Sequence, residues 1–296
     1  MTLHNYRFGC VQGLLFRENV VCQLCLEKKS AFYGIKNKCF KDSYLKSVQL
    51  TLVNKFYQWT LKHKNPVKKY IFLAEFNKKL LSSVLPLKNT VDAGNPDAFG
   101  KGVGNTILKP NYVNDFGFTP RSERSDFYLY VGRLNEQKGV HVLLDIFKKN
   151  KKNIEIIGSG PMEDLVKEAA KNHPNIRYLG YADNAFIIQK LKQSRGLIVP
   201  SLTYEGQPMT ILEAFSTGTP VFASDTKNMD SMITHGQNGF LFQPEKDHTI
   251  FDNLDALDTD NLYENARLTY KEKYSPEKNY DYLMNIYKQA ISNDEL

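Results

Sequence analysis

Between residues 127 and 242, short apolar segments alternate with stretches of helical periodicity, and this alternation constrains the fold more than any other feature of the sequence. Each apolar segment has the length of one strand. When a helix connects two neighbouring parallel strands, the connection is a right-handed crossover. Repeated strand-helix units of this kind build a parallel sheet with helices on both faces. We predict a doubly wound α/β domain with strands at Phe127–Val131, Ile154–Ile157, Ile176–Leu179, Gly196–Pro200, Pro220–Ala223 and Gly239–Phe242.

A second, less regular α/β region precedes this domain. A polar segment at residues 114–126 resembles a linker between the two regions. We expect an N-terminal domain over residues 1–113, a C-terminal domain over residues 114–274, and a terminal amphipathic helix over residues 275–296. The elements predicted in the first part are a helix over Ser43–Lys64, a strand over Tyr70–Ala74, a helix over Glu75–Val84, a loop over Ala93–Asn105 and a strand over Thr106–Asn111.

The composition is that of an ordinary globular protein. With 42% hydrophobic and 24% charged residues over 296 positions, the chain can build two sizeable cores. The sequence contains no run of about 18 apolar residues, and its start lacks the basic, apolar and small-residue order of a secretory signal. We therefore expect a cytoplasmic protein.

Positive charge is concentrated in the front part. Residues 1–110 hold 18 Lys or Arg against 6 Asp or Glu, a balance of +12, whereas residues 111–296 hold 21 against 26, a balance of −5. The positive electrostatic field of these residues can attract phosphates or an anionic membrane surface. A solvated Lys-rich surface without a partner explains the same charge balance equally well. The front part shows no nucleic-acid-binding signature and is mostly Lys rather than Arg, so nucleic acid is not an expected partner.

All cysteines of the chain fall near its start, in the spacing C-x11-C-x2-C-x13-C. Four thiolates, two of them on a C-x-x-C turn, can hold a structural zinc ion tetrahedrally in a reducing compartment. The outer spacings match no zinc module closely, so reduced cysteines without a metal stay as the alternative and the metal is left open. The residues concerned are Cys10, Cys22, Cys25 and Cys39.

Two loops that follow predicted strands carry features of an anion site, and ligands of a doubly wound sheet lie at the carboxyl ends of strands. Arg133 and Lys138 lie in a loop that opens a helix, where two cations beside free backbone N–H groups suit a diphosphate; an exposed basic loop is the alternative. Gly158 and Gly160 follow the second strand and permit close backbone approach to a ligand. This Gly-x-Gly lacks the third glycine and the later acidic residue of a dinucleotide fingerprint.

Two carboxylates, Glu205 and Glu213, follow the fourth predicted strand. Glu205 lies in a loop, and Glu213 lies in a helix that Pro208 is expected to begin. Glu205 can accept hydrogen bonds from sugar hydroxyls, and Glu213 can reach a vicinal diol such as ribose; pairing with a neighbouring lysine is the ordinary alternative. Backbone N–H groups at the helix start can meet phosphate or sugar oxygens, namely those of Gln207, Met209 and Thr210.

In their order along the chain, these segments resemble family 4 (group 1) of the retaining glycosyltransferases. The match extends from about Leu3 to the final helix, and the glutamate-x7-glutamate segment is its most specific part. The resemblance implies the GT-B fold, in which two Rossmann-like domains face a cleft and the C-terminal domain holds most of the nucleotide-sugar donor. The matching segments are Gly132-Arg133-Leu134 with Lys138-Gly139, Glu205-Gly206-x-Pro208-x4-Glu213-Ala214, Gly218-Thr219-Pro220-Val221 and Gly236-x-x-Gly239.

The resemblance also implies a role for each candidate residue. Arg133 and Lys138 would neutralise the donor diphosphate, Glu205 would hold the donor sugar, and Glu213 would hold the ribose. His4, in the string Thr2-Leu3-His4-Asn5-Tyr6-Arg7, maps onto the histidine that faces the reacting sugar in that family. Main-chain groups around Gln207–Thr210 would contact sugar and phosphate. Because protein groups would neutralise the departing diphosphate, no metal or other cofactor is required.

The sequence departs from the family pattern in two places. Gln207 stands where the family commonly has an aromatic or aliphatic residue, which leaves the donor sugar open. The chain begins at the His-bearing strand, so we expect the N-terminal domain to be incomplete, with only about its second half encoded. Missing strands would leave unpaired sheet edges and an exposed core face.

The function predicted from the sequence is transfer of a sugar from a nucleotide sugar to a hydroxyl acceptor in surface polysaccharide or glycolipid synthesis. The expected partners are a nucleotide sugar, a glycan or lipid-linked acceptor, and an anionic membrane surface on the cytoplasmic side, where the protein would be peripheral. The alternative is a truncated chain that binds the donor without catalysis. A nicotinamide-dependent dehydrogenase is disfavoured because the dinucleotide fingerprint is absent.

Overall fold

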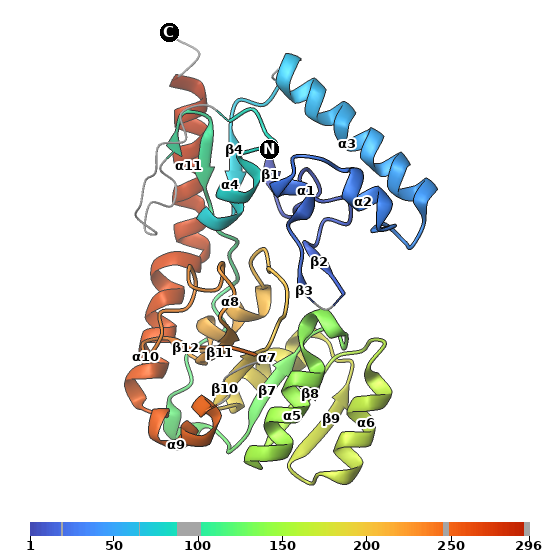
Figure 1. The fold of residues 1–296 in the computed structure, drawn as a ribbon. Helices are drawn as coiled ribbons and strands as arrows, with labels where there is room; N and C mark the ends of the chain where they lie inside the picture. Colours follow the sequence, from blue (N-terminus) through green and yellow to red (C-terminus); the bar gives the residue numbers. More distant parts are fainter. Residues whose placement is uncertain (19, 65, 88–101, 245–248, 293–296) are drawn as a thin grey trace. The chain divides into compact units, whose positions relative to one another are not determined.

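The chain folds into two compact units. A computed structural model describes residues 1–18, 20–64, 66–87, 102–244 and 249–292 (Figure 1). Unit 1 comprises Met1–Asn111 and Asn279–Leu296, and unit 2 comprises Tyr112–Lys278. Each unit is built on a sheet of its own.

The sheet of unit 2 is parallel throughout and has the strand order β12-β11-β10-β7-β8-β9. Its central strands β7, β10 and β11 are mostly apolar because helices cover both faces of the sheet. The strand predictions are confirmed, since each observed end lies within one residue of the expected one. The strands are β7 (Tyr128–Val131), β8 (Ile154–Ile157), β9 (Ile176–Gly180), β10 (Gly196–Val199), β11 (Val221–Ser224) and β12 (Gly239–Phe242).

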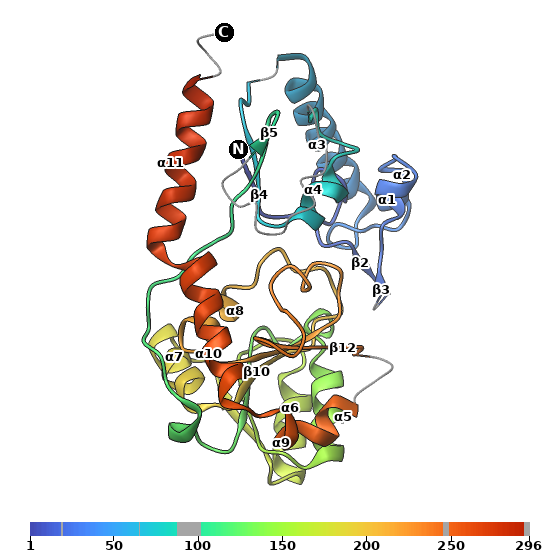
Figure 2. The ribbon, with the colours of Figure 1, turned by 90° about the vertical axis from the view of Figure 1, so that its left-hand side faces the viewer.

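Helices lie on both sides of this sheet (Figures 1 and 2). They are α5 (Val140–Asn150), α6 (Glu163–Asn172), α7 (Asn184–Gln193), α8 (Met209–Ser216), α9 (Leu254–Leu257) and α10 (Asp260–Thr269). Leu129 and Leu197 point to one face and join an aliphatic core with α7, α8 and α10. Tyr128 and Phe222 point to the other face, where their rings and that of Phe147 on α5 lie about 6 Å apart. The sheet therefore has two different cores.

The polar segment at residues 114–126, predicted as a linker, packs within unit 2 instead. Arg124 is buried, and its guanidinium donates hydrogen bonds to the carbonyl oxygens of Leu191, Ser194 and Thr217 over 2.7–2.9 Å. Burial lowers the pKa of Arg124 to about 10, so it stays charged at neutral pH. The linker prediction was wrong because this polar residue satisfies buried backbone carbonyls rather than facing water.

Unit 1 is built on shorter strands, in the order β1-β4-β6-β5, with β5 antiparallel to β6 and the other pairs parallel. The helices α3 (Tyr44–Lys64) and α4 (Glu75–Leu81) flank β4, as their periodicity predicts. The loop expected at Ala93–Asn105 lies mostly outside the described residues, and β5 forms in its last part. The strands are β1 (Thr2–Leu3), β4 (Tyr70–Phe72), β5 (Gly102–Val103) and β6 (Thr106–Leu108).

Residues 6–42 form a segment of short elements, which we call the cysteine segment. A hairpin of two-residue strands is followed by one helix of four residues and one of five. Such short elements are marginal alone and depend on packing. The sequence analysis did not predict them, because they are too short to show a period. They are β2 (Phe16–Arg17), β3 (Val20–Val21), α1 (Leu24–Glu27) and α2 (Phe32–Lys36).

The last helix, α11 (Pro276–Ser292), carries residues of both units (Figure 2). Within unit 1, Asn279 donates a hydrogen bond to the Pro110 carbonyl oxygen at 3.1 Å, and Ile286 is buried. Tyr280 and Tyr287 on the same helix are more than half exposed. The amphipathic face is therefore narrower than the sequence suggested.

Candidate functional site

The strand order of unit 2 determines where a ligand can bind. From β7 the chain first builds outward through β8 to β9, then returns to the other side of β7 and continues through β10 and β11 to β12. The loops after β7 and β10 therefore leave neighbouring strands in opposite directions. In doubly wound sheets the usual ligand position lies outside the carboxyl ends of the two strands at such a reversal.

An ion pair joins these two loops. The Lys138 Nζ lies 2.5 Å from Glu205 Oε1, and the Ser201 hydroxyl donates to the same oxygen at 2.7 Å. The Leu202 amide also donates to the Gln137 carbonyl oxygen at 2.9 Å. The side chains of Lys138 and Glu205 are 33% and 13% exposed, so a polar ligand can compete for both. The structure thus brings together a predicted cation and a predicted carboxylate.

The backbone shapes the loop after β7. The Asn135 side chain accepts a hydrogen bond from the Lys138 amide at 3.0 Å. Gly139 has a φ of +66°, and a Cβ there would lie 1.9 Å from the Pro200 carbonyl oxygen. Arg133 lies in the same loop with its side chain exposed. The loop therefore fixes the position of Lys138 and leaves the Arg133 guanidinium accessible.

Gly158 brings the loop after β8 against the loop after β7. Its φ is +146°, and a Cβ there would lie 1.8 Å from the Gly132 carbonyl oxygen, so only glycine fits. A Cβ on Gly160 would lie 2.4 Å from the Leu134 carbonyl oxygen. The Tyr178 hydroxyl donates to the Gly158 carbonyl at 2.9 Å. Both glycines serve close packing of the loops, and their contact with a ligand stays a prediction.

The start of α8 lies at the same edge of the sheet. The helix begins at Met209, and Pro208 occupies the N-cap position, not the first helical position that the sequence suggested. The extended backbone of Pro208, with ψ of 123°, explains the difference. Met209 is exposed, Thr210 is half-buried, and the Gln207 side chain is buried. The first amides of α8 therefore begin where the loop after β10 ends, a position suited to anionic oxygens.

Glu213 is buried one turn inside α8. Its side-chain oxygen Oε1 accepts a hydrogen bond from Asn184 Nδ2 at 2.8 Å. Burial raises the pKa of Glu213, and the hydrogen bond from Asn184 partly opposes the shift. A carboxyl group held in this way has further acceptor capacity for a diol.

Two asparagines of the site escaped the sequence analysis. Asn184 begins α7 after β9 and holds Glu213. Asn228 is buried in the turn after β11, and its Nδ2 donates to the backbone carbonyl of Glu205. Both follow predicted strands at the carboxyl edge of the sheet. The rule that selected Arg133 and Glu205 by position, applied to every strand, would have found them.

His4 lies in unit 1, directly after β1, and is exposed. Its neighbour Tyr6 is buried and donates a hydrogen bond to Asn77 Oδ1 at 2.7 Å. This bond anchors the string that contains His4 to α4. His4 belongs to unit 1 and Glu205 to unit 2, and their action on one sugar stays a prediction.

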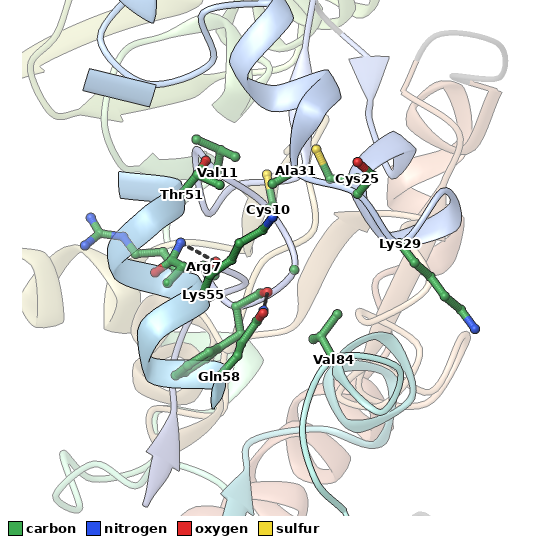
Figure 3. A pocket seen from close by; sticks show the side chains of 14 residues that line it. Arg7, Cys10, Val11, Cys25, Lys29, Ala31, Thr51, Lys55, Gln58 and Val84 are labelled. Carbon is green, nitrogen blue, oxygen red and sulfur yellow. Dashed lines mark hydrogen bonds between the residues drawn. The ribbon is translucent and has the colours of Figure 1, made fainter. Parts of the chain in front are cut away.

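Unit 1 has a cavity of about 140 Å³ beside α3 (Figure 3). Its lining residues include the cations Arg7, Lys29 and Lys55 and contain no Asp or Glu. Gln58 on α3 donates to the Phe8 carbonyl oxygen at 2.6 Å and so ties the loop after β1 to this helix. The lining gives the cavity a positive field that suits an anion.

The helix α3 turns apolar side chains to solvent. Leu45, Leu52, Phe56 and Trp59 are 51–68% exposed, whereas Thr51 is buried. No described helix combines the length and the apolar character that crossing a membrane requires. Lysines accompany the exposed apolar residues along α3, at Lys46, Lys55, Lys62 and Lys64.

Comparison with known families gives a match over most of unit 2. The family model described as "Glycosyl transferases group 1" matches residues 114–275, which is more than half of the chain. An uncharacterized glycosyltransferase of Methanocaldococcus jannaschii is 31% identical over 176 residues, or 55% of this chain and 45% of that protein. O-antigen chain mannosyltransferase C of Escherichia coli is 26% identical over 177 residues, or 57% and 48%. The chain therefore spans about half the length of these curated relatives.

Solved structures share the fold. TarM of S. aureus, a variant in complex with fondaparinux, α-GlcNAc-glycerol and UDP, superposes with a TM-score of 0.59 at 20% identity. The match covers 79% of this chain and 46% of that one. The neighbours are GT-B proteins, and the six-stranded sheet of unit 2 corresponds to a Rossmann-like domain. The α/β fold class predicted from the sequence is confirmed.

Proposed function

The chain belongs to the group 1 glycosyl transferases, and on that premise we propose that it moves a sugar from a nucleotide-diphosphate donor to a hydroxyl acceptor with retention of configuration. The observation that carries the proposal is the Lys138–Glu205 pair at the strand reversal of unit 2. A cation suited to a diphosphate and a carboxylate suited to sugar hydroxyls lie there side by side. TarM, which has a similar fold, was crystallised with UDP, and this supports a nucleotide-sugar donor.

The donor would lie across the carboxyl edge of the sheet. Arg133 and Lys138 bind the diphosphate, Glu205 binds the sugar hydroxyls, and Glu213 accepts hydrogen bonds from the ribose diol. The loop at Gly158 and Gly160 brings backbone groups close to the phosphates. The main chain at the start of α8 completes the donor contacts through Gln207, Met209 and Thr210.

Donor binding exchanges the partners of the ion pair. Without a donor, Lys138 and Glu205 neutralise each other. With a donor, Lys138 turns to the phosphate oxygens and Glu205 to the sugar. Negative charge then develops on the departing diphosphate, and Arg133, Lys138 and the first amides of α8 are already positioned to stabilise it. We expect turnover without added Mg²⁺ or Mn²⁺, because these protein groups supply the positive charge.

The acceptor would bind to unit 1. His4 faces the reacting sugar in this proposal. The cavity beside α3 carries Arg7, Lys29 and Lys55 and suits an acceptor with phosphate groups, such as a lipid-linked glycan. The E. coli relative is named an O-antigen chain mannosyltransferase. A role in surface polysaccharide or glycolipid synthesis follows from these features together.

A titration with donor fragments tests the donor site. We expect Arg133→Ala to weaken binding of UDP or GDP about tenfold or more, because a charge-assisted contact to the diphosphate is lost. Glu205→Ala should weaken binding of the whole nucleotide sugar while leaving that of the nucleoside diphosphate undiminished. Lys171→Ala, which removes an exposed lysine from α6, is the control. Equal donor affinities in all three variants would contradict the proposed site.

A transfer assay separates the enzyme from a second candidate. The second candidate is a protein that binds the donor without catalysis, because the residues proposed to bind the donor all belong to unit 2. Labelled nucleotide sugars are incubated with the protein and with glycan or lipid-linked acceptors. Transfer or donor hydrolysis that is lost in His4→Ala supports the enzyme. Donor binding without either reaction supports the alternative.

We further propose that the protein is peripheral at an anionic membrane. The exposed apolar residues of α3 and its lysines form a surface of the kind that inserts at a lipid interface. Sedimentation with vesicles that contain phosphatidylglycerol tests the surface. Phe56→Ser should lower binding, whereas Tyr181→Ser, which changes an 81% exposed aromatic residue of unit 2, should not. Equal binding to uncharged phosphatidylcholine vesicles would contradict the electrostatic part of the proposal.

A further inference from the structure

The four cysteines of unit 1 line one small cavity. Its volume is about 20 Å³, and its lining contains Cys10, Cys22, Cys25 and Cys39, which are all the cysteines of the chain. A space of this size holds one water-sized sphere. All four residues are free thiols and half-buried. The cysteine segment therefore gathers all the cysteines of the chain around an ion-sized space.

We propose that this cavity is a structural zinc site with the four thiolates as tetrahedral ligands. A site with four protein ligands leaves no open position for substrate, which is typical of structural zinc. The C-x-x-C turn supplies Cys22 and Cys25, and the Gly34 amide donates a hydrogen bond to the Cys25 sulfur. Hydrogen bonds of this kind orient metal ligands. Figure 3 shows the sulfur atoms of Cys10 and Cys25 on the same side of the larger neighbouring cavity.

Zinc binding would draw the thiols closer together. Among the described residues, no group of three or more His, Cys, Asp or Glu side chains is arranged to hold a metal ion as it stands. Rotation about χ1 moves a sulfur atom while the backbone stays in place. That backbone is held, since the Cys22 amide donates to the Leu15 carbonyl at 2.8 Å and the Cys39 amide donates to the Gly34 carbonyl at 2.9 Å. We therefore expect side-chain rotation to bring the sulfur atoms to the ion.

The cysteine segment needs a cross-link. It consists of strands of two residues and helices of four and five residues, which provide few backbone hydrogen bonds. Six of the seven described non-glycine residues with positive φ fall between Leu15 and Asp42. Such backbone conformations are unfavourable for side chains with a Cβ. A metal ion compensates for a small core and for strain of this kind.

The charge around the cavity suits the proposed centre. A zinc ion with four thiolates carries a net charge of about −2. Residues 10–42 hold six Lys or Arg against three Asp or Glu, and Arg17 lines the cavity itself. Positive surroundings stabilise a negative centre. The basic character of this segment thus has a structural use apart from any acceptor.

The test is the metal content of the full chain, purified without chelators and under reducing conditions. We expect about one zinc ion per chain, and about tenfold less in the Cys25→Ser variant. Asn37→Ala changes a lining residue without a thiol and should keep its zinc. Co²⁺ in place of zinc should give the visible absorption bands of tetrahedral thiolate coordination. Absence of zinc from the wild-type chain, or zinc retained by Cys25→Ser, would overturn the proposal.

A second measurement does not depend on a variant that folds. The wild-type protein is treated with iodoacetamide in its zinc-loaded form and after removal of the metal with EDTA, and the mass increase is followed over time. Bound thiolates should react at least about tenfold more slowly than the freed thiols. Equal alkylation rates in the two forms would contradict a zinc site. A mass that corresponds to disulfides in the reduced preparation would contradict it as well.

Discussion

Unit 2 and unit 1 are stabilised in different ways. Unit 2 has parallel strands of four or five residues with a core on each face, and its candidate residues follow these strands at one edge of the sheet. Unit 1 has strands of two or three residues, and α3 directs apolar side chains to solvent. Unit 2 and its candidate residues are thus specified by local periodicity, whereas we propose that unit 1 depends on a cross-link and on partners that periodicity does not reveal.

The sharpest test of this difference is to destabilise unit 2 alone. Arg124→Ala removes the donor to several buried carbonyl oxygens, so we expect the free energy of unfolding of unit 2 to fall by about 3–5 kcal/mol. Trp59 on α3 is the single tryptophan of the chain and reports on unit 1. Urea unfolding should therefore show an earlier transition in far-UV circular dichroism with an unchanged transition in tryptophan fluorescence.

Arg121→Ala is the matched control for that experiment. Its side chain is 40% exposed and pairs with Asp258, so its removal should cost far less than the loss of Arg124. If tryptophan fluorescence moved together with circular dichroism in Arg124→Ala, the two units would unfold as one. The comparison between independently stabilised units would then fail.

The next largest effect concerns the close packing of loops in unit 2. Gly158→Ala forces a Cβ to within 1.8 Å of the Gly132 carbonyl oxygen, and we expect a loss of about 2–4 kcal/mol together with weaker donor binding. Gly180→Ala adds a Cβ at a φ of +76° with no atom within 4 Å. It should cost about 1 kcal/mol through backbone strain alone. Equal losses in urea unfolding would contradict steric packing as the reason for Gly158.

A smaller effect is the coupling between Lys138 and Glu205. A double-mutant cycle with Lys138→Met and Glu205→Gln, measured on the free energy of unfolding, should give a coupling energy of about 1 kcal/mol. The reason is that the ion pair is partly shielded from water. The exposed pair Glu163 and Lys167 on α6 is the control and should show no measurable coupling. Saturation with a nucleotide sugar should abolish the coupling of the first pair, since each partner then binds the donor. Coupling that persists with donor bound would contradict the exchange of partners.

The same contrast explains how much could be predicted from the sequence. The strands of unit 2 were located within one residue because each is an apolar segment between helical stretches. The elements β2, β3, α1 and α2 were not predicted, because contacts across the cysteine segment form them rather than a period. Lys138 and Glu205 were selected separately for their positions after strands. The two residues are 67 positions apart in the sequence. Predicting that they pair requires the strand order of the sheet, which no local sequence pattern contains.

The smallest expected effect is a pH dependence that is confined to unit 2. Burial raises the pKa of Glu213 above its ordinary value of 4.5, so the native chain binds more protons than the unfolded chain between these two values. The stability contributed by the protonated group is fully present below the unfolded pKa and is lost as the pH rises through the native pKa. Glu213→Gln has no such titration, so the free energy of unfolding of the wild type relative to this variant should decline across that window and be constant outside it. Circular dichroism at a series of pH values measures this difference. Asn184→Ala should enlarge the decline, because the hydrogen bond that opposes the rise in the pKa of Glu213 is lost. A difference in the free energy of unfolding that rises with pH would show instead that the fold stabilises Glu213 as a carboxylate.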